Sequence, residues 1–139
     1  MRQALREAER AYAAGEIPIG AVVAFTKTGQ IIGRGHNQTE QLRDVTAHAE
    51  MLALTAAANF LGNKYLHDCT LYVTVEPCVM CAGATAWAQV PQVVYGTPEP
   101  KVGYSRHGQL LHPRCQVVTG VLAGECAALM QRFFAERRK

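Results

Sequence analysis

The feature that most constrains the fold is a β-type run, a helical run and a second β-type run between residues 70 and 96. Residues 70–75 and 92–96 are rich in β-branched and aromatic side chains, which favour strands. Pro77 suits the first turn of a helix, so we expect one from this residue to about Ala88. Two strands joined by one helix predict a right-handed parallel crossover, with ligand-binding loops at the strand ends.

The other segments predict further strands and helices around this unit. Before this unit, periodicity and turn residues predict a first helix to about Ala14, a hairpin of residues 21–25 and 31–35, and a helix capped by Asp44 or Thr46 that runs toward Gly62. After it, they predict a surface loop at 97–114, a short strand at 116–119 and a C-terminal helix with an apolar stripe at 122–133. We therefore expect an α/β fold in a single domain spanning residues 1–139.

Composition restricts the class of protein but not its substrate. The chain has 139 residues, of which 49% are hydrophobic and 18% charged, values that suit one compact domain. A formal net charge of +3 permits a nucleic-acid partner without requiring one. No segment has the apolar run of a signal peptide or of a membrane span, so we expect a cytoplasmic protein with no membrane association. In that compartment the five cysteines are not expected to form a disulfide framework.

Two short motifs carry the candidate chemistry. Cys78 and Cys81 lie three residues apart at the start of the predicted helix, where the helix dipole favours the thiolate form that binds metal. His48 would be a third zinc ligand, leaving the fourth tetrahedral position open for water, as in catalytic zinc sites. Glu50 would then carry protons beside that water, provided that both side chains lie in the open first turn of their helix.

Each motif alone has ordinary interpretations. A single C-x-x-C also occurs in redox dithiols, in structural zinc sites and in plain helix packing. His48 could be a buried, hydrogen-bonded core residue and Glu50 a capping or solvated carboxylate. The remaining cysteines, Cys69, Cys115 and Cys126, are expected to be small apolar core residues, although one of them or His67 could supply a fourth ligand and make the site structural.

The combination of the two motifs is more specific than either. H-x-E followed by P-C-x-x-C is the signature of zinc-dependent nucleobase deaminases. The sequence resembles the cytidine-deaminase-like superfamily and, within it, the bacterial tRNA-specific adenosine deaminases. Outside the two motifs, the resemblance covers residues 15–22, 36–37, 71–78, 120–122, 125–129, 133–134 and 137–138. It implies a three-layer α/β/α fold with a central mixed sheet, a homodimer, and deamination of adenosine to inosine at the first anticodon position of tRNA.

The resemblance also implies roles for individual residues. It places one zinc per chain on His48, Cys78 and Cys81, makes Glu50 the proton shuttle, and requires no organic cofactor. It brings Asn37 to the flipped nucleoside and the Ala49 backbone N–H beside the reacting oxygen. The residues expected to hold the tRNA anticodon stem-loop are Glu99, Lys101, Phe133, Phe134, Arg137 and Arg138. Around Glu99 the chain has Pro-Glu-Pro-Lys where the best-known bacterial members have Arg-Asp-Ala-Lys.

Two other functions remain open from the sequence. A deaminase of a free base or nucleoside, such as guanine, cytosine or cytidine, would share the zinc motif. A zinc-stabilised binding module without turnover would leave Glu50 with no task.

Overall fold

The strand–helix–strand unit predicted from the sequence is present in the computed structural model, which describes residues 1–138. It consists of β3 (Cys69–Val75), α3 (Val79–Trp87) and β4 (Gln92–Thr97). The two strands pair in parallel, with Leu71 opposite Val93. The other elements are α1 (Arg2–Ala13), β1 (Gly20–Phe25), β2 (Ile31–His36), α2 (Ala49–Leu61), the 3₁₀ helix η1 (Tyr104–His107), β5 (Gln116–Val118) and α4 (Ala123–Arg137).

The strands form one mixed five-stranded sheet in the order β2-β1-β3-β4-β5. β1 pairs antiparallel with β2 and β3, whereas β3, β4 and β5 are parallel to one another. The expected hairpin, parallel crossover and short last strand are therefore confirmed. Because Gly20 lies opposite His36 and Val75 lies opposite Thr97, the beginning of β1 and the ends of β2, β3 and β4 share one edge of the sheet.

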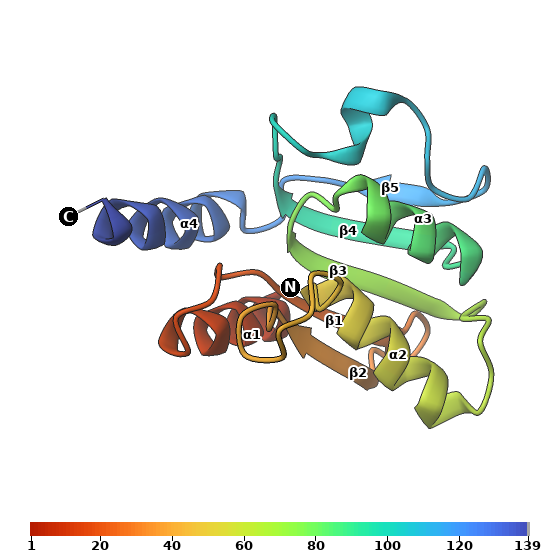
Figure 1. Ribbon diagram of the computed structural model, residues 1–139. Coiled ribbons are helices and arrows are strands. Elements are labelled where there is room, and N and C mark those ends of the chain that lie inside the picture. Colours follow the sequence, from red (N-terminus) through yellow and green to blue (C-terminus); the bar gives the residue numbers. More distant parts are fainter. Residues whose placement is uncertain (139) are drawn as a thin grey trace.

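Two pairs of helices cover the two faces of this sheet, which confirms the predicted three-layer α/β/α arrangement (Figure 1). α2 and α3 lie on the face that carries Ala21, Val23 and Leu71, and these side chains form the main buried cluster with both helices. α1 and α4 cover the opposite face, which includes Gly20 and Gly96. A helix on each face shields the parallel strands β3 and β4 from water, whereas the short last strand β5 is exposed.

Glycines allow the helices to approach the sheet very closely. A Cβ atom on Gly20 would lie 2.1 Å from the carbonyl oxygen of Ala4 in α1. A Cβ on Gly35 would lie 2.3 Å from the carbonyl oxygen of Ala49, the first residue of α2. Both distances are far shorter than a van der Waals contact, so only glycine fits there. Gly35 therefore places the first turn of α2 directly against the end of β2.

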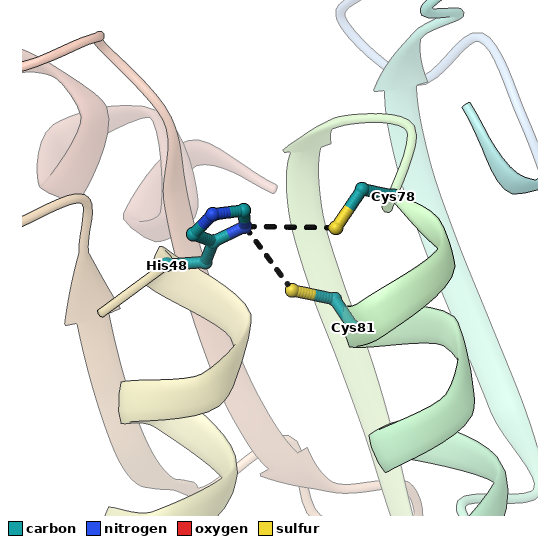
Figure 2. Close-up of side chains that lie close together, drawn as sticks. All are labelled: His48, Cys78 and Cys81. Atoms are coloured by element: carbon teal, nitrogen blue, oxygen red, sulfur yellow. Dashed lines mark hydrogen bonds between the residues drawn. The ribbon is translucent and has the colours of Figure 1, made fainter. Parts of the chain in front are cut away.

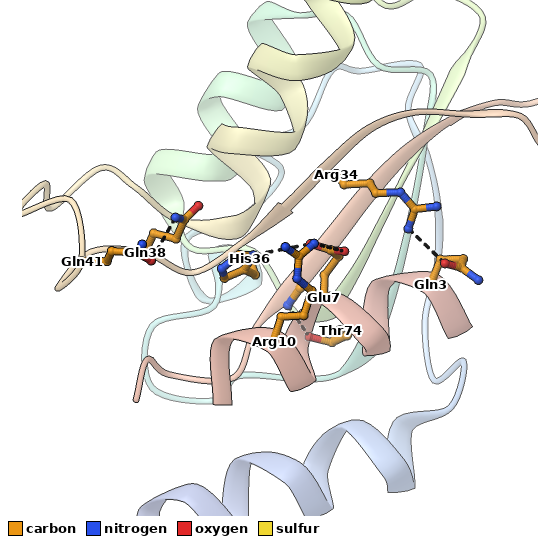
Figure 3. A network of polar contacts seen from close by, with 9 residues as sticks. Gln3, Glu7, Arg10, Arg34, His36, Gln38, Gln41 and Thr74 are labelled. Atoms are coloured by element: carbon orange, nitrogen blue, oxygen red, sulfur yellow. Dashed lines mark hydrogen bonds and ion pairs between the residues drawn. The ribbon is translucent and has the colours of Figure 1, made fainter. Parts of the chain in front are cut away.

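Polar contacts tie α1 to the same edge of the sheet (Figure 3). Glu7 is 4% exposed, and its carboxylate lies 3.4 Å from His36 Nδ1 and 3.3 Å from Arg10 Nη1. Next to them, the Gly20 N–H donates a hydrogen bond to Thr74 Oγ1 at 3.2 Å. A buried carboxylate is tolerated when such donors surround it, so this network fixes the position of His36 and of the chain that follows it.

Three details differ from the sequence-based predictions. The cap of α2 is His48, not Asp44 or Thr46, because the Asp44 carboxylate accepts hydrogen bonds from the N–H and hydroxyl of Thr46 within the preceding loop. α3 begins at Val79, with Cys78 as its cap, and not at Pro77. The segment 97–114 is not simply a solvated loop, since it contains η1 and buries Tyr104. No helix in residues 1–138 is long and apolar enough to cross a membrane.

Candidate active site

Two helix N-termini meet at the candidate site. His48 is the cap residue of α2 and Cys78 is the cap residue of α3, while Cys81 lies in the first turn of α3. Neither side chain makes a capping hydrogen bond, and both point toward the space between the two helices (Figure 2). Each helix also directs its positive dipole end and its unpaired N–H groups there, which favours thiolate and carboxylate groups.

The distances between the donor atoms fit a tetrahedral zinc site. His48 Nδ1 lies 3.6 Å from Cys78 Sγ and 3.5 Å from Cys81 Sγ, and all three atoms lie within 4.8 Å of one another. Zinc binds thiolate at about 2.3 Å and imidazole at about 2.0–2.1 Å, so the S···N edge of a regular tetrahedron is about 3.5–3.6 Å. Two soft sulfurs and one imidazole are also the donor set that zinc prefers. The residues present therefore fit this metal.

The ionisation of the cluster shows how strongly the three groups interact. A hydrogen bond from Cys81 is the main cause that lowers the pKa of Cys78 to about 4, and His48 lowers it further. The same contact with Cys78, together with burial, raises the pKa of Cys81 well above its usual range. The hydrogen bond with Cys78 also raises the pKa of His48. Cys78 is thus a thiolate near neutral pH, and a bound cation is what would remove the proton from Cys81.

Glu50 lies on the first turn of α2, two residues after His48. It is only 3% exposed, and burial raises the pKa of its carboxyl from 4.5 to about 7, with the negative charge of Cys78 adding to the effect. A carboxyl group with a pKa near neutrality can both accept and release a proton during turnover. Glu50 lies in the open first turn of α2, which is the condition stated above for a proton carrier beside the metal ligands.

Asn37 and Ala49 lie at the same edge of the sheet. Asn37 directly follows β2, is 5% exposed, and donates its backbone N–H to the Ile19 carbonyl oxygen at 3.0 Å. Ala49 is the first residue of α2 and is fully buried, and backbone N–H groups at this position have no partner within the helix. The close contact of α2 with Gly35 brings the two segments together.

Glu99 and Lys101 follow β4 in the loop that contains η1. The backbone N–H of Lys101 donates to Glu99 Oε1 at 2.9 Å, and Arg106 Nη1 donates to the Lys101 carbonyl oxygen at 2.6 Å. Lys101 itself is exposed. These contacts give the loop a defined shape, although the sequence shows little periodicity there.

Sequence reasoning missed two buried carboxylates that hold the neighbouring loops. Glu16 is 2% exposed and accepts hydrogen bonds from the backbone N–H groups of Glu40 and Gln41 at 3.2 and 2.8 Å. Glu76 is 5% exposed and accepts three hydrogen bonds from the loop after β4. Burial alone would raise the pKa of Glu76, but its hydrogen bonds with Ser105 and the Glu99 N–H lower the pKa below its usual value. The sequence did contain a signal for these buried carboxylates, since both are charged residues within apolar or turn segments.

The predicted tail residues gather at the C-terminal end of α4, beside the C-terminal end of α1. Phe133 is 7% exposed and packs edge-on against Tyr12 with ring centroids 6.1 Å apart, whereas Phe134 is 40% exposed. Arg137 donates a hydrogen bond to the Gly15 carbonyl oxygen at 2.6 Å and lies over the Phe133 ring. Phe134 and Arg137 also line a surface pocket of about 400 Å³ together with Gly15–Ile17 and residues 39–40. Arg138 is exposed.

The alternative metal ligands do not join the cluster. Cys69 and Cys126 are buried in the core, Cys115 is partly buried, and all three are free thiols. His67 lies 2.6 Å from Gln89 Oε1 and stacks on Tyr65. Within residues 1–138, only His48, Cys78 and Cys81 form a group that could hold a metal ion. The structure therefore matches the three-ligand arrangement of a catalytic zinc site and not a closed structural one.

Comparisons with known proteins agree with this site. The family model of the cytidine and deoxycytidylate deaminase zinc-binding region matches residues 1–97. A tRNA-specific adenosine deaminase of Streptococcus pyogenes serotype M18 is 45% identical over all of this chain and 90% of its own length. A structure from work on A-to-I editing by tRNA:A34 deaminases at the wobble position has a TM-score of 0.85 and 38% identity, covering 93% of this chain and 96% of that one. A guanine deaminase from Nitrosomonas europaea has a TM-score of 0.82 and 26% identity, covering 95% and 81%.

Proposed function

The chain belongs to the cytidine and deoxycytidylate deaminase family, and from this premise we propose that it is a zinc-dependent hydrolase that deaminates adenosine to inosine at the first anticodon position of tRNA. The observation that carries the chemistry is the cluster of His48 Nδ1 and the two sulfurs of Cys78 and Cys81, with Glu50 buried beside it. Similarity to tRNA-specific adenosine deaminases over the whole chain, at 45% identity, supports the substrate, as does the tRNA:A34 deaminase structure, which covers 93% of this chain.

One zinc ion per chain would be held by His48, Cys78 and Cys81. Zinc in such a site supplies Lewis-acid chemistry and lowers the pKa of water to about 7. Glu50 takes the proton from the attacking water and gives it to the purine ring nitrogen next to the amino group. It then moves the proton of the newly added hydroxyl to the amino group, which leaves as ammonia while the C=O bond of inosine forms; a pKa of about 7 permits proton transfer in both directions. The Ala49 N–H, at the positive end of α2, donates to the oxygen on which charge develops.

The remaining predicted contacts hold the substrate. Asn37 would bind the nucleoside that is flipped out of the anticodon loop, where an unpaired base can be extruded at little cost. Glu99 and Lys101 would contact the RNA backbone. In the tail, Phe134 is an exposed aromatic that can stack on a base, whereas Phe133 is buried. Arg137 and Arg138 are both exposed cations that can meet phosphates, and Arg137 also donates to the Gly15 carbonyl oxygen. A tRNA substrate implies a cytoplasmic protein.

We further propose that residues 1–139 act as one domain that forms a homodimer through α3. Val79, Gly83 and Trp87 follow one another at intervals of four residues on this helix. Val79 is 46% exposed and Trp87 is 84% exposed, and nothing lies within 4 Å of the Cβ position of Gly83. A smooth apolar helix face of this kind suits a second copy of the same chain. Light scattering on Trp87→Glu should show a monomer where the wild type is a dimer.

A substrate panel tests the proposed activity. The purified protein should convert adenosine to inosine in tRNA and leave free adenosine, guanine and cytosine unchanged, as measured by sequencing of the tRNA and by chromatography of the small molecules. Turnover of guanine or cytosine without tRNA editing would replace the proposal with the free-base alternative. Lack of turnover on all of them, with zinc bound, would favour the binding module.

A variant of Glu50 separates the proton carrier from the metal ligands. Glu50→Ala should retain one zinc per chain by metal analysis and lose turnover by about 10²-fold or more, because the carboxylate moves protons and does not hold metal. Glu125→Ala is the control, since this carboxylate is exposed on α4 and pairs only with Arg2. Loss of zinc from Glu50→Ala would show that Glu50 is itself a ligand.

A further inference from the structure

The buried carboxylate of Glu76 has no part in the metal cluster, yet it lies two residues before Cys78. Its Oε1 accepts a hydrogen bond from the Glu99 N–H at 3.0 Å. Its Oε2 accepts one from the Ser105 N–H at 3.0 Å and one from the Ser105 hydroxyl at 2.6 Å. All three donors belong to the loop of residues 98–107, which we call the β4 loop. A single side chain thus holds both ends of this loop.

The residues next to Glu76 hold the β4 loop as well. The Tyr104 N–H donates to the Pro77 carbonyl oxygen at 2.9 Å, and Cys78 forms an isolated β-bridge with Gly103. A Cβ atom on Gly103 would lie 2.5 Å from the Glu76 carboxyl and 2.4 Å from the Glu99 carbonyl oxygen. Only a glycine lets the carboxylate come so close to the loop backbone. The segment that carries the metal ligands and the β4 loop are therefore built as one unit.

The geometry requires a carboxylate and not merely a polar residue at position 76. Three donors converge on two oxygens, and a carboxylate is an acceptor at both. A glutamine has one acceptor oxygen, so its NH₂ group would face either the Glu99 N–H or the two donors of Ser105. At least one N–H that bonds to this carboxylate would then lose its partner.

We propose that Glu76 is a positioning residue that sets the β4 loop, and with it Glu99 and Lys101, at a fixed place relative to Cys78. The β4 loop carries the contacts proposed for the RNA backbone, and Cys78 is a proposed metal ligand, so the Glu76 carboxylate would determine where the substrate is held with respect to the reacting centre. A β4 loop that is no longer held in place must become ordered when the substrate binds, which weakens binding. The inference about substrate rests on the proposed function, whereas the inference about the loop does not.

Amide hydrogen exchange tests the loop without any substrate. In Glu76→Gln, exchange at the Glu99 and Ser105 amides should become about 10- to 100-fold faster, the factor that corresponds to a lost hydrogen bond to a charged group. Zinc content should stay at the wild-type level. Glu16→Gln is the matched control, since this equally buried carboxylate holds a different loop and should leave those two amides unchanged. Unchanged exchange at both amides in Glu76→Gln would overturn the proposal.

Ser105→Ala is the milder variant should Glu76→Gln fail to fold. It removes only the 2.6 Å hydrogen bond from the Ser105 hydroxyl, and Ser105 is exposed, so folding should be preserved. Exchange at the Glu99 and Ser105 amides should rise in the same direction but by a smaller factor. If Ser105→Ala folds with unchanged exchange at both amides, the carboxylate does not organise the loop and the proposal fails.

Steady-state kinetics test the effect on substrate. With tRNA as substrate, KM should rise about tenfold in Glu76→Gln and less in Ser105→Ala, with kcat lowered by less than KM is raised, because the loop contributes binding and not proton transfer. A fall in kcat with unchanged KM, or a loss of zinc, would place the role of Glu76 in the cysteine segment instead. If wild-type protein does not edit tRNA at all, the proposed function fails, while the exchange result still decides the role of Glu76 in the loop.

Discussion

The buried carboxyl of Glu50 should make the metal-free protein less stable as pH rises, and Glu50→Gln should remove that dependence. Burial raises the pKa of this group from 4.5 to about 7. Between these two values the folded protein keeps the proton and the unfolded chain has released it, so the free energy of unfolding falls as pH increases. The cost is absent below about pH 4.5 and complete above about pH 7.

The magnitude follows from the pKa difference. A rise from 4.5 to about 7 is about 2.5 units, and one unit corresponds to about 1.36 kcal/mol, so the ionised carboxylate costs about 3 kcal/mol. Glutamine has nearly the same shape and does not ionise. Metal-free Glu50→Gln should therefore match the wild type near pH 4.5 and exceed it by about 3 kcal/mol at pH 8. Because urea m-values for small proteins are about 1–3 kcal/mol/M, the unfolding midpoint should rise by about 1–3 M.

The assay is urea unfolding, followed by circular dichroism, of chelator-treated wild type and Glu50→Gln at several pH values from 4.5 to 8. His48 and the two cysteines titrate in both proteins. Because Glu50 also raises the pKa values of His48 and Cys81, the difference between variants reports Glu50 together with its interaction with these two residues. Zinc should reduce the difference, since a divalent cation nearby favours the carboxylate. An equal loss of stability with pH in both variants would show that Glu50 is not the cause. Glu50→Gln should also lose turnover. Glu50 would then be a residue that lowers the stability of the protein but is retained because the reaction needs it.

Other perturbations test the ligands, the helix contact and the tail. Cys78→Ser and Cys81→Ser should each lose zinc by metal analysis and melt at a lower temperature, because metal binding contributes to folding; full zinc occupancy in both would refute the site. Gly35→Ala should lower the free energy of unfolding by about 1–3 kcal/mol or more in urea, since its Cβ would meet the backbone of α2 2.3 Å away. Arg138→Ala should weaken tRNA binding and reduce the salt dependence of that binding, with the melting temperature unchanged. Arg137→Ala should have the same effect on tRNA binding and should also lower the melting temperature, because it removes the hydrogen bond to Gly15. Unchanged tRNA affinity in both variants would show that the two arginines are only helix-end charges.

Local chemistry made much of this protein predictable from its sequence. The strands and helices around Cys78 follow from side-chain periodicity and from Pro77, both of which act within a few residues. The H-x-E and P-C-x-x-C motifs identify the donor atoms from the sequence, because zinc in proteins accepts few ligand types. Adjacent residues of a helix point about 100° apart, so Phe133 and Phe134 cannot both face the core, and in the structure Phe133 is buried while Phe134 is exposed.

Tertiary structure decided what depends on residues far apart in the chain. Whether His48 meets Cys78, 30 residues later, was set by the order of the sheet and by Gly35, which lets α2 lie against β2. The cap of α2 was mispredicted because Asp44 bonds to Thr46 in the loop, and a propensity cannot tell which of two nearby acceptors the helix will use. Glu76 and its loop are invisible to periodicity, since a buried carboxylate is recognised only by the donors that surround it, and those donors come from a segment more than 20 residues away.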